Sequence, residues 1–506
     1  MSLQENINLA QQVDIALLLC SLGLASVFLF AWQLRKAVAT RTKLKAIPMV
    51  RSSGIISSWI DAFRFVFHVK EIIEEGHRVH YGSAFKVPLF NRWMIVVSGS
   101  EKINDIWKAS SEQLSLKEAG GELLQTDYTI GHHFIADSYH TDIIQSTLTC
   151  NIRECFVDVQ DEIQVAFKDN IPMTEDWIEV PMYTTILQIV CRASNRMFVG
   201  LPLCCNPNYI KLNINSKAAD PLHVVRIIGS IFTPCSGAAA KMEKFLGQTI
   251  QEQLHQDDVH GKYWPGKPND LLLWLIDVTK GQSERRTVKD LIVRILGLNF
   301  AAIHMTSMTV TIMLFALAAH PEYIQILRDE VETAITAEGT TKAAMGKMHK
   351  LDSFVKETQR LYGGFGVSSM LRLVKKDLVF LDGTVVPAGN HITAASYSTH
   401  MDEENYEDPL EFKPWRFSDK RKEAGKGIRH QMVTTSLDYL LFGGGRPACL
   451  GRFFTINELK ALMAHVLLNF DMKMDKVPET GWFLSDRFPN HSSKVLFRKR
   501  MPTVKV

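Results

Sequence analysis

A single cysteine, Cys449, stands in a segment rich in glycine and proline, FGGGRPACLG at 442–451, directly before the apolar run RFFTINELKALMAHVLL. Glycines at 443, 444, 445 and 451 allow a flat group or another backbone to approach closely. A helix that begins just after the cysteine directs free N–H groups and its positive dipole end at the sulfur, which stabilises a thiolate. An isolated cysteine is most often an inert, buried small side chain. The surroundings of Cys449 instead favour a thiolate that binds iron.

Two other chemistries fit this segment poorly. Zinc is disfavoured because no second cysteine or histidine stands at ligand spacing near Cys449. A phosphate-binding loop is disfavoured because GGGRPACLG has neither the Lys-Ser/Thr ending of one such motif nor the glycine spacing of the other. The remaining cysteines form no CxxC pair and no disulfide-like rhythm, which is typical of a reduced compartment. Cys204 and Cys205 are adjacent, and we interpret them as structural.

Two segments upstream complete a recognisable set of motifs. KETQR contains Glu357 and Arg360 one helical turn apart, and FKPWRF contains Arg416. A Glu and Arg pair on a helix is weak by itself. Together with the segment around Cys449, in this order, the residues resemble the cytochrome P450 family. The motif Phe-x-x-Gly, three residues, Cys-x-Gly is met by four residues, namely Phe442, Gly445, Cys449 and Gly451.

The resemblance implies a cofactor and residues that hold it. Cys449 would be the axial ligand of the iron of haem b, and Glu357, Arg360 and Arg416 would form a buried ion-pair network beneath the haem. The family commonly has an arginine or histidine that binds a haem propionate where this chain has Pro447. The substitutes we expect are Arg446 and Arg372, with His140 as a weaker candidate.

The resemblance also implies a reaction and partners. A haem-thiolate monooxygenase inserts one oxygen atom from O2 into a hydrophobic substrate, with electrons from NADPH through NADPH-cytochrome P450 reductase. The segment GRFFTINELK resembles filamentous-fungal members that act on terpenoid or indole-terpenoid secondary metabolites, which predicts an apolar small-molecule substrate. The basic segment 419–430 with Arg452 either steers the reductase or is an ordinary solvated loop.

Proton delivery departs from the family pattern. The family motif Ala/Gly-Gly-x-Asp/Glu-Thr-Thr corresponds to AAIHMT, which puts His304 at the acid and Met305 at the principal threonine. Thr306 follows and lies near the same helix face, so we predict that Thr306 relays protons, with His304 as a second candidate. The loss of the threonine leaves an alternative open, a haem-thiolate isomerase or dehydratase that does not require NADPH.

The N-terminal segment predicts a membrane anchor. Ile15 to Trp32 is an uncharged run that spans roughly 27 Å as a helix, close to the thickness of a bilayer core. A basic cluster follows it, which favours a cytosolic location for everything downstream. We therefore expect an anchor at 1–34, a basic linker at 35–50 and a haem-thiolate catalytic domain at 51–506, on a single-pass protein of the endoplasmic reticulum in contact with membrane lipid. A cleaved signal peptide is the alternative.

The rest of the chain reads as one large domain, mainly α-helical with a small β-sheet region. Strands are expected at 84–90 and 93–99, with a hairpin turn at Asp382-Gly383. Helices are expected at 142–167, 288–319, 321–335, 351–362 and after Cys449. The long helix at 288–319 suits a membrane span or a buried core helix, and its central polar residues favour burial beside a cavity. For Ser307 and Thr311 we expect hydrogen bonds to the helix's own backbone. A net charge of +3 argues against a nucleic-acid partner.

Overall fold

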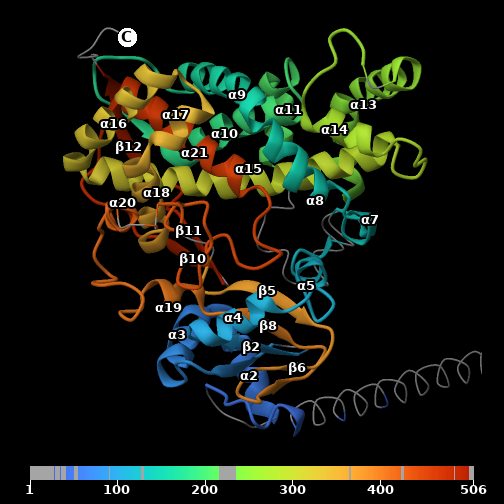
Figure 1. Ribbon diagram of the computed structural model, residues 1–506, viewed down its shortest axis with the longest axis vertical. Coiled ribbons are helices and arrows are strands. Elements are labelled where there is room, and N and C mark those ends of the chain that lie inside the picture. Colours follow the sequence, from blue (N-terminus) through green and yellow to red (C-terminus); the bar gives the residue numbers. More distant parts are fainter. Residues whose placement is uncertain are drawn as a thin grey trace, which may run out of the picture.

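Strands with β-branched and aromatic side chains form one sheet at one end of the computed structural model (Figure 1). The structure describes residues 28, 35, 42–50, 55–89, 92–126, 130–215, 235–261, 263–363, 366–422, 425, 427–483 and 485–500. The sheet has the strand order β1-β2-β8-β5-β3, in which β2 and β8 run parallel and the other neighbours antiparallel. Its strands are β1 (Ala84–Pro88), β2 (Trp93–Val97), β8 (His391–Ala394), β5 (Ser369–Val374) and β3 (Leu114–Ser115).

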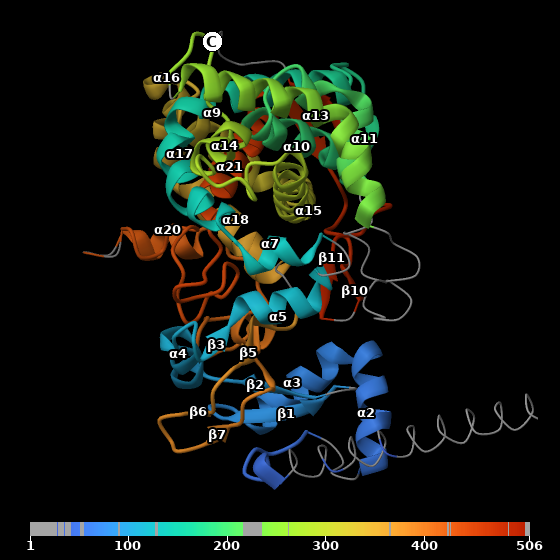
Figure 2. The same cartoon turned by 90° about the vertical axis from the view of Figure 1, so that its right-hand side faces the viewer.

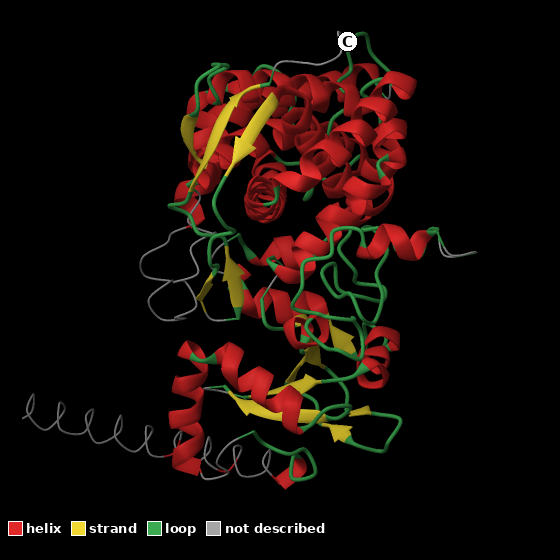
Figure 3. Ribbon diagram, turned by 90° about the vertical axis from the view of Figure 1, so that its left-hand side faces the viewer, coloured by secondary structure: helices red, strands yellow, loops and turns green. Residues whose placement is uncertain are grey.

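Smaller strand pairings complete the β structure. A three-stranded sheet has the order β4-β12-β9 and lies among the helices, and two hairpins, β6-β7 and β10-β11, stand apart from it (Figure 3). The strands are β4 (Ile178–Pro181), β12 (Lys494–Lys499), β9 (Phe470–Lys473), β6 (Leu378–Val379), β7 (Val385–Val386), β10 (Gly481–Phe483) and β11 (Asp486–Phe488). Gly383 has φ +83° in the β6-β7 turn, so the predicted hairpin is confirmed.

Helices make up most of the molecule. Most of them gather at the end away from the five-stranded sheet, around α15 (Val288–Ala319), and a smaller group near the N-terminus lies beside that sheet (Figures 1 and 2). The others are α2 (Ile55–Phe67), α3 (Val69–Val79), α4 (Ser100–Lys108), α5 (Leu116–Leu123), α7 (His132–Ala136), α8 (His140–Asp142), α9 (Thr149–Asn170), α10 (Met182–Phe198), α11 (Pro207–Ile214), α13 (Cys235–His260), α14 (Leu271–Val278), α16 (Ile324–Glu338), α17 (Lys342–Lys347), α18 (His349–Leu361), α19 (Ser396–His400), α20 (Arg416–Arg421) and α21 (Arg452–Asn469).

Most expected elements are confirmed, with two differences. The helix expected at 321–335 begins as a 3₁₀ helix at Pro321–Tyr323, and α16 starts at Ile324. The helix expected at 142–167 is divided: residues Ile143–Leu148 form a π-helix, and α9 begins at Thr149. A π-helix has one more residue per hydrogen-bonded turn than an α-helix, which a hydrophobic pattern does not reveal. The predicted anchor at 15–32 lies, apart from Phe28, outside the described residues.

The helix α15 is a core helix. Its N-cap is Thr287, whose hydroxyl accepts a hydrogen bond from the Asp290 N–H at 3.2 Å. Within the described part of the chain it is also the one helix long and apolar enough to cross a membrane, but most of that stretch is buried inside the protein. The Thr311 hydroxyl donates to the Ser307 carbonyl at 2.8 Å, as predicted. The prediction for Ser307 was wrong, because its buried hydroxyl has no hydrogen-bond partner among the residues that the structure describes.

Candidate active site

The loop around Cys449 is closed by its own backbone. The Cys449 N–H donates to the Phe442 carbonyl at 2.9 Å. Gly443 and Gly445 have φ +66° and +71°, a left-handed conformation that other residues rarely adopt. A Cβ at Gly444 would lie 2.1 Å from the Trp107 ring at the end of α4. The glycines therefore serve both the turn and the close approach of Trp107, a contact that the sequence did not predict because it joins segments over 300 residues apart.

The Cys449 sulfur lies at the start of a helix, as expected. The backbone N–H groups of Gly451 and Arg452 hydrogen-bond to it. Its side chain is accessible on one side, while the neighbouring Phe442 and Ala448 are buried. Burial raises the pKa of the Cys449 thiol above its ordinary value, and the two N–H groups and the Arg452 charge oppose that rise. A cation in front of the sulfur would add to these two N–H groups and stabilise the thiolate.

The three charged residues expected beneath the cofactor lie together. Arg360 makes a bidentate pair with Glu357, at 2.8 and 2.9 Å, and Arg416 bonds the same carboxylate at 3.1 Å. Neither Glu357 nor Arg360 is exposed to solvent. The Arg360 guanidinium also donates to the carbonyls of His400 and Pro409, both at 2.7 Å. These bonds tie α18 to the end of α19 and to the segment that leads from α19 to α20.

The expected propionate-binding residues differ in their surroundings. Arg372, on β5, is buried, and its one hydrogen bond in the described part of the chain goes to the Leu371 carbonyl at 2.8 Å. Burial lowers the pKa of Arg372 to about 10, with no carboxylate opposing the shift. A buried cation of this kind suits an anionic partner. Arg446 is exposed beside Pro447. His140 is buried against Arg294 at 3.1 Å, and burial and the Arg294 charge lower the pKa of His140 to about 4.

The residues expected to deliver protons lie on different sides of α15. Met305 and Ala302 are partly exposed, whereas Thr306 is 2% exposed. In contrast to Thr311, Thr306 makes no side-chain hydrogen bond that is found within the described residues. His304 packs near the Phe300 ring, and its Nε2 is buried without a hydrogen-bond partner in the described ranges of the chain. Burial lowers the pKa of His304, so this imidazole is neutral at pH 7 and a poor acid.

Two close contacts bring together segments from distant parts of the chain. A Cβ at Gly366 would lie 1.9 Å from the Ser485 carbonyl oxygen, which also accepts a hydrogen bond from the Val367 N–H. Phe134 packs its ring against Gly297 of α15, where a Cβ would lie 2.5 Å away. The segment that follows α18 therefore contacts the β10-β11 hairpin, and α7 contacts α15.

The residues present fit haem. The Cys449 thiol, with two backbone N–H groups directed at it, supplies an iron ligand. The loop that holds it has no side chain at Gly444, which lets it pack closely against Trp107. Arg372 supplies a buried positive charge that no carboxylate of the described residues neutralises. These features match an iron macrocycle with anionic side groups.

Comparison with known proteins gives the family. The family model of cytochrome P450 matches residues 77–482. Cytochrome P450 monooxygenase 151 of Postia placenta is 38% identical, covering 94% of this chain and 97% of that protein. Cytochrome P450 monooxygenase CYP512U6 of Ganoderma lucidum is 30% identical, with coverages of 90% and 92%. A solved structure, retinoic acid bound cyanobacterial CYP120A1, shares the fold with a TM-score of 0.67 at 19% identity, covering 87% of this chain and 96% of that one. The chain therefore belongs to the cytochrome P450 family of oxidoreductases.

Proposed function

We propose that the protein is a membrane-anchored haem-thiolate monooxygenase that inserts one oxygen atom from O2 into a hydrophobic substrate, a terpenoid or related secondary metabolite. The observation that carries the proposal is the environment of the Cys449 sulfur. It accepts hydrogen bonds from the backbone N–H groups of Gly451 and Arg452 at the start of α21. Its electrons come from NADPH through NADPH-cytochrome P450 reductase, the kind of redox partner that the family generally uses. The basic segment at 419–430 contributes positive charge for that docking.

Each site residue has a role in this proposal. Haem, when bound, supplies the activation of O2 and the oxidation of an unactivated C–H bond. Cys449 holds the iron as a thiolate, and the two backbone N–H groups help to keep the sulfur negative. Arg372 binds an anionic side group of the cofactor, with Arg446 at the exposed edge. Ala302 and Met305 present small or apolar side chains toward an apolar substrate.

Two surface features support membrane contact. On α2, four large side chains are 51–67% exposed and recur at helical spacing, namely Trp59, Ile60, Phe63 and Phe67. The β6-β7 hairpin exposes Leu381, at 78%, at the same end of the molecule (Figure 2). Exposed apolar groups that gather in this way are typical of a membrane or protein contact. A bilayer beside α2 suits the anchor that we propose at 1–34, ahead of the linker at 35–50 and the catalytic domain at 51–506.

Turnover with labelled O2 tests the proposal. Purified full-length protein, with the reductase and NADPH, is incubated with a panel of terpenoids under isotopically labelled O2. We expect a product that carries one labelled oxygen atom and forms only when both NADPH and the reductase are present. Product without labelled oxygen, formed at the same rate without NADPH, would reject the monooxygenase.

That opposite outcome would favour a second function, a haem-thiolate isomerase or dehydratase. The observation behind it is on α15, where the accessible residue at the principal threonine position is Met305 and the hydroxyl of Thr306 is buried. A thioether has no proton to donate. An enzyme that rearranges an already oxygenated substrate does not need that proton.

For the monooxygenase, we predict that Thr306 Oγ1 delivers the proton, directly or through water. Thr306→Ala should keep NADPH oxidation running but divert electrons to hydrogen peroxide, so that product per NADPH falls severalfold. A positioned proton donor typically contributes about 100-fold or more, and water recovers part of the loss. Met305→Thr should leave coupling unchanged or raise it, because the added hydroxyl supplements an existing path. The ratio of product and peroxide to NADPH is the measurement.

Thr311→Val is the matched control for Thr306. The Thr311 hydroxyl already donates to the Ser307 carbonyl, and Thr311 lies on the same helix, five residues after Thr306. Its product-to-NADPH ratio should equal that of the unaltered protein. An unchanged ratio in Thr306→Ala would reject the relay and would make His304 with ordered water the better candidate.

A further inference from the structure

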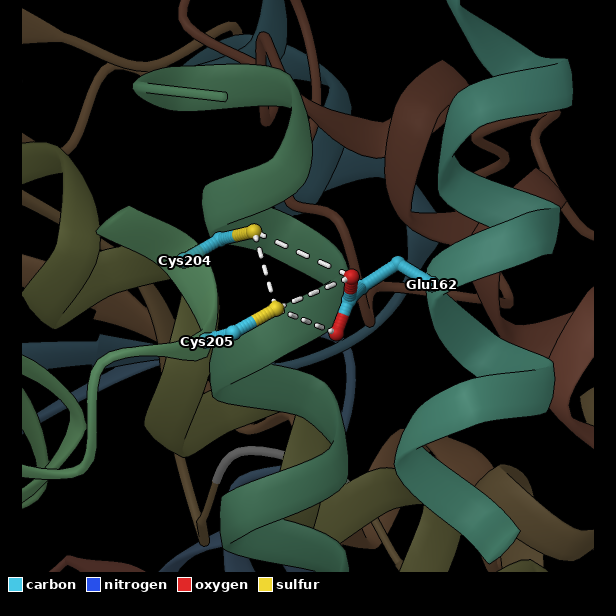
Figure 4. Close-up of side chains that lie close together, drawn as sticks. All are labelled: Glu162, Cys204 and Cys205. Atoms are coloured by element: carbon cyan, nitrogen blue, oxygen red, sulfur yellow. Dashed lines mark hydrogen bonds between the residues drawn. The ribbon is translucent and has the colours of Figure 1, made fainter. Parts of the chain in front are cut away.

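Three side chains that could bind a metal ion lie together outside the proposed active site. Cys204 and Cys205 belong to a short 3₁₀ helix (Leu203–Cys205), and Glu162 reaches them from α9 (Figure 4). Cys204 and Glu162 are buried, and Cys205 is partly exposed. Two adjacent thiols beside a buried carboxylate are a donor set that thiophilic cations prefer. The sequence interpretation of the cysteine pair as structural did not include Glu162, which is over 40 residues away.

The distances between the donor atoms suit an ion with tetrahedral coordination. The two sulfurs are 3.7 Å apart, and Glu162 Oε2 lies 3.3 Å from the Cys205 sulfur and 3.8 Å from that of Cys204. In a tetrahedral zinc site, bonds of about 2.3 Å to sulfur and about 2.0 Å to oxygen give separations of about 3.8 Å between sulfurs and about 3.5 Å from sulfur to oxygen. One ion therefore reaches all three atoms without a large movement.

The carboxylate is also held in place. Arg192 of α10 donates to Glu162 Oε1 at 2.5 Å, and Oε2 lies within 3.8 Å of both sulfurs. Oε1 also accepts from the Cys205 thiol at 3.4 Å, and the Arg192 guanidinium lies 3.7 Å from that sulfur. The same guanidinium donates to Asp169 at 2.6 Å. Carboxylates that bind metals are commonly oriented by a second hydrogen bond of this kind. The partial exposure of Cys205 gives an ion a route in from solvent and room for water as the fourth ligand.

We propose that Cys204, Cys205 and Glu162 form a binding site for a thiophilic divalent cation of the Zn²⁺ class, separate from the haem site. In the absence of an ion, the thiols instead donate hydrogen bonds to Glu162. Binding replaces these hydrogen bonds with metal–ligand bonds and ties α9 to the segment after α10. The reaction releases the thiol protons to solvent and needs no oxidant.

Zinc content per haem iron tests the site. Full-length haem-loaded protein is freed of loose metal with a chelator, dialysed against Zn²⁺, and analysed for zinc and iron. We expect one Zn²⁺ per chain. Cys205→Ser should weaken zinc binding by at least about tenfold, because substitution of a residue that only orients a metal ligand already costs about 10- to 100-fold in affinity. Cys150→Ser, which removes an exposed cysteine outside the cluster, should bind zinc like the unaltered protein.

Cysteine alkylation gives a second readout that does not depend on zinc content or on activity. Zn²⁺ should protect Cys205 from alkylation while Cys150 reacts equally with and without the ion. Glu162→Gln, which keeps a hydrogen-bond acceptor for Arg192, should reduce that protection. Zinc content that is unchanged by Cys205→Ser, alkylation of Cys205 that is insensitive to zinc, or a disulfide between the two cysteines in the purified protein would overturn the proposal.

Discussion

Replacement of Cys449 by alanine should abolish the thiolate-type spectrum of the reduced carbon monoxide complex and, with it, NADPH-dependent turnover. The reason is local: the sulfur is the atom to which the N–H groups of Gly451 and Arg452 are directed. Alanine removes the ligand without filling the loop, so the backbone bond from the Cys449 N–H to the Phe442 carbonyl is kept. The measurement is the carbon monoxide difference spectrum of purified protein, normalised to its haem content.

Two further variants make this result interpretable. Cys150→Ser removes an exposed cysteine and should leave both spectrum and turnover unchanged. Cys449→Ser keeps the size of the side chain, so a loss of the thiolate-type spectrum in a folded Cys449→Ser protein separates ligation from folding. A thiolate-type spectrum in either Cys449 variant would show that another residue binds the iron.

Disruption of the Glu357 network should cost the protein a large part of its stability and most of its haem. Glu357→Ala leaves the Arg360 and Arg416 guanidinium groups without their carboxylate, and Arg360→Ala removes the bidentate partner of a fully buried Glu357. Removing one member of a buried ion pair costs about 3 to 5 kcal/mol because the other charge stays buried. A typical domain has only about 5 to 15 kcal/mol of stability. Haem per polypeptide and the apparent melting temperature are the two measurements.

An exposed pair supplies the contrast. Asp419 and Lys422 on and beside α20 form an ion pair at 2.7 Å with the same i, i+3 spacing as Glu357 and Arg360, but both side chains are more than half exposed. Such pairs contribute about 0 to 1 kcal/mol. Asp419→Ala should therefore have normal haem content and melting. Normal haem loading in both Glu357→Ala and Arg360→Ala would mean that the buried network does not support the cofactor site.

Local chemistry in the sequence determined the family and the nature of the loop. The order of Glu357, Arg360, Arg416 and Cys449 is a one-dimensional pattern, and each motif is short, so no knowledge of packing is needed to recognise it. The bounds of α15 were likewise predictable, because a long apolar run with a threonine cap and a histidine after its end is a local signal.

Tertiary packing decided what local patterns do not contain. Two aromatic rings pack against glycines that are far away in the chain, Trp107 against Gly444 and Phe134 against Gly297. The glycine in the sequence does not indicate which ring packs against it. The surroundings of Arg372 were also decided by packing, because only the folded chain shows that a buried guanidinium has no carboxylate beside it in the described residues.

The site at Cys204 and Cys205 also depends partly on the sequence and partly on tertiary packing. The sequence identified Cys204 and Cys205 as neighbours but gave no reason to connect them with Glu162. Helix α9 places Glu162 beside α10, where Arg192 donates to Oε1, and Oε2 lies within 3.8 Å of both sulfurs. The types of donor atom are therefore properties of the sequence. Their separation of 3.3 to 3.8 Å is set by how α9 and α10 pack, because only that packing brings residues over 40 positions apart within bonding reach of one ion.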